Sequence, residues 1–155
     1  MKVSARGIRA ELPMGWEARI GQRDDALAHA AGAVGSAHPV AHLASFDLPD
    51  ERGDYGSGAV DVMRPLDALI VLVEHDPTSI GTALFARVGM PRRLTATQFS
   101  PAALQRTIPG QGGFQCFFTE AGRAFSLYVV LGSHALAHRM VGVVNDVLST
   151  VRLDR

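Results

Sequence analysis

Two pairs of histidines, each with members four residues apart, are the first residues in this sequence that could do chemistry. His134 and His138 fall where a helix is predicted, so their imidazoles would share one face and could hold a transition metal. A zinc site takes three or four ligands, and no further histidine or cysteine has a spacing that completes the set. His38 and His42 repeat the spacing, but Pro39 between them indicates an extended segment. The sequence therefore predicts neither a metal site nor any other cofactor.

The run Glu74-His75-Asp76 carries groups that can act as general acids and bases. It ends a predicted strand, where neighbouring side chains point to opposite faces, so the three groups would not converge on one substrate. The serines in Gly56-Ser-Gly58 and Gly132-Ser-His134 lack the Gly-x-Ser-x-Gly turn that presents a nucleophilic serine. We therefore assign no catalytic residue, and the sequence favours a protein that is not an enzyme.

A glycine-rich segment and a single cysteine complete the candidates for chemistry. Gly110-Gln-Gly-Gly113 precedes a predicted strand and no Lys-Ser/Thr follows it, whereas a phosphate-binding loop precedes a helix. Cys116 is the one cysteine of the chain, so no internal disulfide can form. Its position in the middle of a predicted strand indicates a buried, inert thiol.

Arginines and a tyrosine on two loops are the candidates for binding a partner. Arg87, Arg92 and Arg93 lie on one short connection, where three guanidinium groups could form a site for an anion or an acidic partner. Tyr55 lies in the loop at 49–58, and tyrosines on loops often anchor protein interfaces. The alternative for both segments is a solvated loop that binds nothing.

The elements that must position these residues follow from the hydrophobic periodicity. Residues 2–12 and 16–20 alternate apolar and polar side chains around Leu12-Pro-Met-Gly15, which predicts an opening hairpin. Residues 59–63 are predicted to form a short strand. Residues 68–75 are apolar on both faces, which predicts a strand in the interior of an antiparallel sheet.

The last quarter of the chain predicts a hairpin followed by a long helix. Residues 114–131 are rich in aromatic and β-branched side chains around Glu120-Ala-Gly-Arg123, which is a hairpin pattern. Earlier, Ser100 and Pro101 predict the start of a short helix over 102–106. From 134 to 151 apolar residues recur every three or four positions, which predicts a helix with one face packed on the sheet. The apolar positions are Leu136, Met140, Val143, Val144, Val147, Leu148 and Val151.

Length and composition predict one α+β domain over residues 1–155. Apolar residues make up 47% of the chain, and 15 basic residues balance 15 acidic ones, which argues against nucleic-acid binding. The longest purely apolar run, 68–73, is too short to span a membrane, and the first twelve residues lack an apolar run of signal-peptide length. We therefore expect a cytoplasmic protein. The Ala/Gly-rich segment at 22–37 predicts a mobile loop, with a short Ala-rich helix near 24–31 as the alternative.

The order of these elements resembles that of PsbP-like proteins. The opening hairpin carries Leu12-Pro-Met-Gly-Trp16, the closing hairpin carries Gly122-Arg-Ala-Phe125, and the final helix ends in Val144-Asn-Asp-Val-Leu-Ser-Thr-Val-Arg-Leu153. The group includes an extrinsic photosystem II subunit, a Ran-binding nuclear import factor and actinobacterial lipoproteins, and this chain looks most like actinobacterial cytoplasmic members. The resemblance implies an α/β/α sandwich and a binding or assembly function without catalytic residues.

We therefore expect an adaptor that binds another protein and uses no cofactor. The alternative is a small-molecule binder or an enzyme with a pocket between sheet and helix, because an apolar pocket leaves little trace in a sequence. An enclosed cavity would favour the ligand, and a filled core with an exposed apolar edge would favour the protein partner. The aromatic rings of 114–131 occupy both faces of their strands, so either a second helical layer or a homodimer must cover the face that the last helix leaves open.

Overall fold

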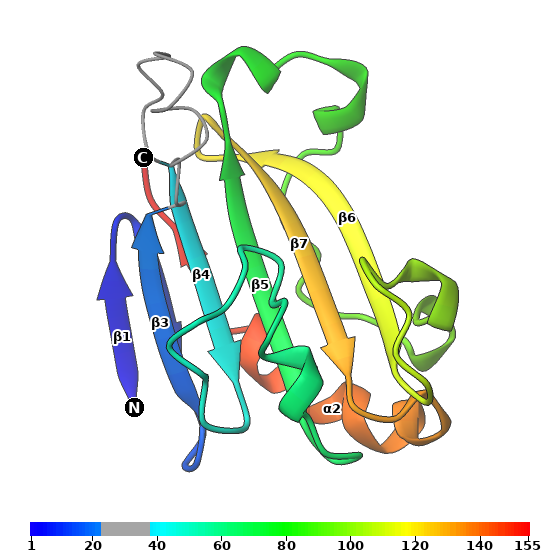
Figure 1. Cartoon of the computed structure of the whole chain (residues 1–155). Coiled ribbons are helices and arrows are strands. Elements are labelled where there is room, and N and C mark those ends of the chain that lie inside the picture. The colour runs from blue at the N-terminus through cyan, green and yellow to red at the C-terminus, as the bar shows by residue number, and fades with distance from the viewer. Residues whose placement is uncertain (23–37) are drawn as a thin grey trace.

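The computed structural model describes residues 1–22 and 38–155, so the predicted mobile segment at 22–37 lies outside the described residues apart from Gln22. The described strands form two antiparallel sheets, and helix α2 (Ala137–Leu148) packs on one face of the larger sheet (Figure 1). This arrangement confirms the predicted α+β class. The small sheet has the order β1 (Lys2–Ala5), β2 (Ile8–Glu11), β8 (Arg152–Leu153). The large sheet has the order β3 (Glu17–Gln22), β4 (Pro39–Ala44), β5 (Ala68–His75), β7 (Arg123–Leu131), β6 (Gly112–Glu120).

Strand β5 lies at the centre of the large sheet, between β4 and β7, as its two-sided apolar pattern predicts. Ile70 pairs with Val129 and belongs to the core on the α2 side. Val71 pairs with Tyr128 and belongs to a second core on the opposite face. Both faces of β5 are therefore covered by other parts of the chain.

Helix α2 buries the predicted apolar stripe against the sheet apart from Val143, which is 38% exposed. It is shorter than the predicted helix at 134–151 and follows a short 3₁₀ turn, His134–Leu136. Val144, Val147 and Leu148 are fully buried in the same core as Leu72 and Leu127. Filling this interface with close-packed aliphatic side chains stabilises the fold, because each buried side chain contributes roughly 1.5–3 kcal/mol. Within the residues that the structure covers, no helix is both long and apolar enough to cross a membrane.

The other face of the large sheet is covered by coil and 3₁₀ turns. Phe46, Leu48 and Val60 pack there against Val71 and Val130, and the segment at 104–108 closes the remaining side. In Figure 1 the connection between β4 and β5 crosses this face, opposite α2. Among the described elements, coil therefore stands where the PsbP-like resemblance implies a second helical layer.

The N-terminal part differs from the predicted opening hairpin. Residues 2–11 form a hairpin by themselves, because Arg6 and Gly7 have φ angles of +53° and +75° and make a two-residue turn that joins Ala5 to Ile8. Two positive φ angles give the backbone twist that suits such a turn. The turn could not be predicted from the hydrophobic pattern, because apolar and polar residues alternate on both sides of it. Strand β3 pairs with β4 instead of with the N-terminal segment.

Two further predictions concern short elements. The strand predicted at 59–63 is wrong, since Val60–Val62 forms a 3₁₀ turn in the coil layer. Ser100 does cap a helical turn, because its Oγ accepts a hydrogen bond from the Ala102 N–H at 3.1 Å. The turn spans only Pro101–Ala103, so it is shorter than predicted.

Candidate functional site

The three arginines predicted to bind a partner line one groove of about 740 Å³. One wall is the connection that carries Arg87, Arg92 and Arg93, and the other wall is an exposed face of α2. Asn145 and Asp146 of α2 lie three and four residues after Gly142, which places them on the same side of the helix, and Ser149 follows directly after the helix ends. We call this site the arginine groove; its lining residues are Arg87, Met90, Pro91, Arg92, Arg93, Gly142, Asn145, Asp146 and Ser149.

Two sets of hydrogen bonds hold the connection in place. Near its start, the Thr119 N–H donates to the Arg87 carbonyl oxygen at 2.8 Å, and the Gly89 N–H donates to the Thr119 carbonyl oxygen at 2.9 Å. Near its end, Asn145 of α2 accepts from the Leu94 N–H at 2.8 Å and donates to the Leu94 carbonyl oxygen at 2.9 Å. The groove is therefore fixed between strand β6 and helix α2.

Arg92 is engaged within the chain. Its guanidinium donates to both carboxylate oxygens of Glu120 at 3.0 and 2.8 Å and to the Val151 carbonyl oxygen at 3.2 Å. The hydrogen bond from Arg92 is the main reason that the pKa of Glu120 lies below its usual value. Arg92 therefore holds the groove together and has little capacity left for an external anion.

Arg87 and Arg93 are the available cations of the groove. Both are exposed, and neither forms a salt bridge with any residue in the described ranges. Two apolar side chains stand beside them on the same segment: Val88 is 89% exposed and Leu84 is 60% exposed. Exposed apolar groups next to guanidinium groups without a carboxylate partner are a combination that protein interfaces use.

Tyr55 lies away from the arginine groove, on the opposite face of the large sheet. Its hydroxyl is 3.2 Å from Ser126 Oγ, and its ring meets Tyr128 edge-on with the ring centroids 6.1 Å apart. The side chain is half-buried, and these contacts hold its loop against strand β7. The structure therefore brings the three arginines together and places Tyr55 at a separate site.

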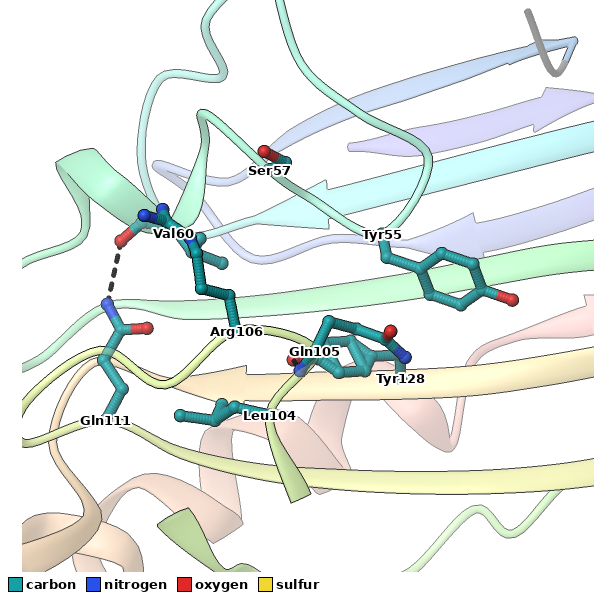
Figure 2. Close-up of a pocket in the computed structure, with 8 residues that line it drawn as sticks. All are labelled: Tyr55, Ser57, Val60, Leu104, Gln105, Arg106, Gln111 and Tyr128. Atoms are coloured by element: carbon teal, nitrogen blue, oxygen red, sulfur yellow. Dashed lines mark hydrogen bonds between the residues drawn. The ribbon is translucent and has the colours of Figure 1, made fainter. Parts of the chain in front are cut away.

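That separate site is a cavity of about 220 Å³ between two loops on the coil-covered face, shown in Figure 2. We call it the tyrosine pocket. Its apolar walls come from Tyr55, Val60, Leu104 and Tyr128. The Gln105 N–H donates to the Tyr128 hydroxyl at 2.8 Å, which fixes the second loop to the sheet. Its lining residues are Tyr55, Ser57, Val60, Leu104, Gln105, Arg106, Gln111 and Tyr128.

Gln111 is the residue of the tyrosine pocket that sequence reasoning missed. Its side chain is buried, and its Nε2 donates to the Val60 carbonyl oxygen at 2.8 Å, but its Oε1 has no hydrogen-bond partner. In the sequence it is one polar residue in a glycine-rich turn, and nothing nearby indicates burial. Its partner is 51 residues away, so only the tertiary structure reveals the site.

The other candidates for chemistry are engaged or separated. His75 Nε2 lies 3.1 Å from Ser126 Oγ, but Ser126 is fully buried and out of reach of any substrate. His134 Nε2 contacts the Phe99 carbonyl oxygen at 3.1 Å, whereas His138 points to solvent. No group of three His, Cys, Asp or Glu residues that could hold a metal occurs in the described part of the chain.

The remaining thiol and imidazole show the effect of burial. Cys116 is half-buried, and loss of solvent raises the pKa of its thiol, so the reactive thiolate is disfavoured. His42 is buried, and the same loss of solvent lowers the pKa of its imidazole. Its Nδ1 accepts a hydrogen bond from Arg52 Nε at 3.0 Å, so Nε2 carries the proton and donates to the Asp54 carbonyl oxygen at 2.8 Å.

Comparison with protein-family models, with curated proteins and with solved structures found no match to this chain.

Proposed function

We propose that this chain is a non-catalytic adaptor that binds an acidic, partly apolar segment of another protein in the arginine groove. The observation that carries the proposal is that Arg87 and Arg93 face one groove without a salt-bridge partner in the described ranges, next to the exposed Val88. The interface between sheet and α2 is filled by buried side chains, and Leu84 and Val88 form an exposed apolar edge. That combination is the one expected for a protein partner.

The charges on the two walls of the groove determine which wall the carboxylates of the partner face. Arg87 and Arg93 lie on the wall formed by the connection, whereas Asp146 lies on the α2 wall. An acidic segment gains favourable charge pairing only on the first side, because Asp146 repels carboxylates on the second. We therefore expect the carboxylates of the partner to lie along the connection and its apolar side chains to pack on Val88.

The direct test is selection of short random peptides on the immobilised protein, followed by affinity measurements on the enriched sequences. We expect peptides that combine Asp or Glu with aliphatic residues, and we expect their affinity to fall with added salt. The double variant Arg87→Glu/Arg93→Glu should weaken their binding by at least about tenfold, because both guanidinium groups then become repelling carboxylates.

Arg155→Glu is the matched control, since Arg155 is also exposed and also forms no salt bridge in the described part of the chain. It makes the same substitution at one position outside the groove, with half the charge change of the double variant, and should leave the affinity unchanged. Enriched peptides without acidic residues, or equal binding by the double variant and the wild type, would refute the proposal.

The resemblance to PsbP-like proteins is part of this proposal, as is the cytoplasm as the site of action. Support comes from an antiparallel sheet with a C-terminal helix on one face, together with the binding and assembly functions that the group mostly performs.

A further inference from the structure

The tyrosine pocket has a buried floor and an exposed rim. Val60, Tyr128 and Gln111 are buried, whereas Ser57, Gln105 and Arg106 are exposed, so the cavity connects to solvent along the rim. Arg106 forms a salt bridge with Asp61 there, which links the two loops at the entrance. In Figure 2 the labelled side chains surround one space above strand β7. The cavity is thus a defined site, bounded by two loops and strand β7.

The side-chain amide of Gln111 has an orientation that its surroundings determine. The Val60 carbonyl oxygen can only accept a hydrogen bond, so the NH₂ group of Gln111 must face it, at 2.8 Å. Turning the amide over would put two oxygen atoms face to face. The oxygen Oε1 therefore points to the opposite side, toward Leu104 and Arg106 in Figure 2.

This oxygen is a buried acceptor without a donor. Gln111 is only 4% exposed, and Oε1 is the one buried side-chain polar atom in the described residues that has no hydrogen-bond partner. Buried polar atoms are nearly always satisfied, because losing water without gaining a donor is costly. The other buried polar side chains, His42, Asp67 and Ser126, all form hydrogen bonds.

We propose that the tyrosine pocket binds a compact, uncharged ring compound whose hydroxyl or N–H group donates to Gln111 Oε1. The cavity of about 220 Å³ exceeds the roughly 150 Å³ that holds benzene in an engineered apolar cavity, so one ring with small substituents fits. Tyr55, Leu104 and Tyr128 supply apolar contacts to the ring, and the donor satisfies the amide oxygen. Because the oxygen is screened in the empty pocket, a side chain of the pocket wall must shift as the ligand enters.

Water alone is a poor occupant of this site. One water molecule takes about 30 Å³ in the liquid and needs two to four polar partners. A single water at Gln111 would fill a small part of the cavity, and the apolar walls offer few groups to bind others. A ring compound with one donor uses both the apolar walls and the unpaired oxygen.

The probe is phenol, and anisole is the matched compound that replaces the O–H donor with a methyl ether. Nuclear magnetic resonance titration of the full chain should show shifts for pocket residues that saturate, with a dissociation constant for phenol of about 1 mM or below. Anisole should bind at least about fivefold more weakly, because it leaves Oε1 unsatisfied.

Two variants separate the contributions of the oxygen and of the space. Gln111→Leu should remove the preference for phenol over anisole. Leu104→Trp keeps Gln111 and fills the cavity, so it should abolish binding of both compounds. Arg87→Glu/Arg93→Glu lies at the arginine groove and should bind phenol as the wild type does, which keeps this inference independent of the proposed adaptor function.

The inference fails if phenol and anisole bind the wild type equally, because the oxygen then contributes nothing. It also fails if phenol causes no saturable shifts at the pocket, or if Leu104→Trp binds phenol as well as the wild type does. An ordered water at Gln111 in a crystal soaked with phenol, with no phenol beside it, would identify the pocket as a hydration site only.

Discussion

Arg123 holds both carboxylate oxygens of Glu74, with distances of 2.7 Å from Nη2 to Oε1 and 3.2 Å from Nε to Oε2. The same guanidinium donates to the backbone carbonyl oxygens of Arg6, Gly7 and Asp154. Glu74 belongs to β5 of the large sheet, whereas these carbonyl groups flank strands of the small sheet. One buried ion pair therefore joins the two sheets.

Replacing Arg123 with Met should destabilise the protein by about 3 kcal/mol, because Glu74 would keep a buried charge without a partner. The two side chains are only 13% and 12% exposed, so solvent cannot take over the function of the guanidinium. Urea unfolding measures the loss. Arg9→Met removes the exposed pair between Arg9 and Asp154 and should change the unfolding midpoint very little. Equal effects of the two substitutions would contradict a structural function for Arg123.

Acid should destabilise the protein through His42. Burial lowers the pKa of His42 in the folded state below its ordinary value of 6.5. The unfolded state therefore binds the proton more readily, and the stability that the neutral imidazole provides is lost as the pH falls through 6.5 toward the folded pKa. Each unit between the two pKa values is worth about 1.4 kcal/mol.

To check this prediction, the free energy of unfolding is measured at pH 7.5 and at pH 5 for the wild type and for His42→Gln. The wild type should lose more stability between the two pH values than His42→Gln does. His138→Gln is the control, since His138 is exposed, and it should follow the wild type. A variant at His42 with an unchanged pH dependence would show that another group is responsible.

Two neighbouring valines test the placement of helix α2. Val144 is fully buried and Val143 is 38% exposed, so the same substitution meets opposite surroundings. Val144→Asp should destabilise the protein by about 4 kcal/mol or more, because it buries an unpaired carboxylate. Val143→Asp should cost about 0.5 kcal/mol or less. If Val144→Asp melts at the same temperature as the wild type, Val144 is not buried and the placement of the helix is wrong.

Of the two surfaces that a homodimer could use, the sheet face and an edge strand, the structure leaves the edge strand. Phe118, Phe125 and Tyr128 are buried by the chain itself, and Phe114 and Phe117 are half-buried, so the rings leave little of the sheet face open to a second subunit. The outer edge of β3 ends the large sheet, so two copies could pair there. Light scattering at micromolar concentration decides between the two states. A mass of 16.5 kDa excludes the dimer, and twice that mass confirms it.

The local hydrophobic pattern was enough to predict the central strand and the C-terminal helix. The two-sided apolar run at 68–75 had to be central, and the stripe at 134–151 had to face a sheet. The N-terminal hairpin was missed because Arg6-Gly7 interrupts an alternation that continues on both sides. The candidate sites were predicted only in part. Arg87, Arg92 and Arg93 are close in sequence, but Asn145 and Gln111 acquire their functions from partners about fifty residues away.

The coil layer over the second face of the large sheet and the sheet itself are held by different kinds of contact. Backbone ladders hold the strands, whereas apolar packing and side-chain hydrogen bonds at Tyr55, Tyr128 and His42 hold the layer. Such a layer can open as a separate cooperative unit while the sheet and α2 remain folded. In native-state hydrogen exchange, amides at 53–60 should then exchange with a lower opening energy than those at 69–73. Partial unfolding of this kind would briefly expose Val71 and Val130, making the coil-covered face the place where aggregation of the native protein begins.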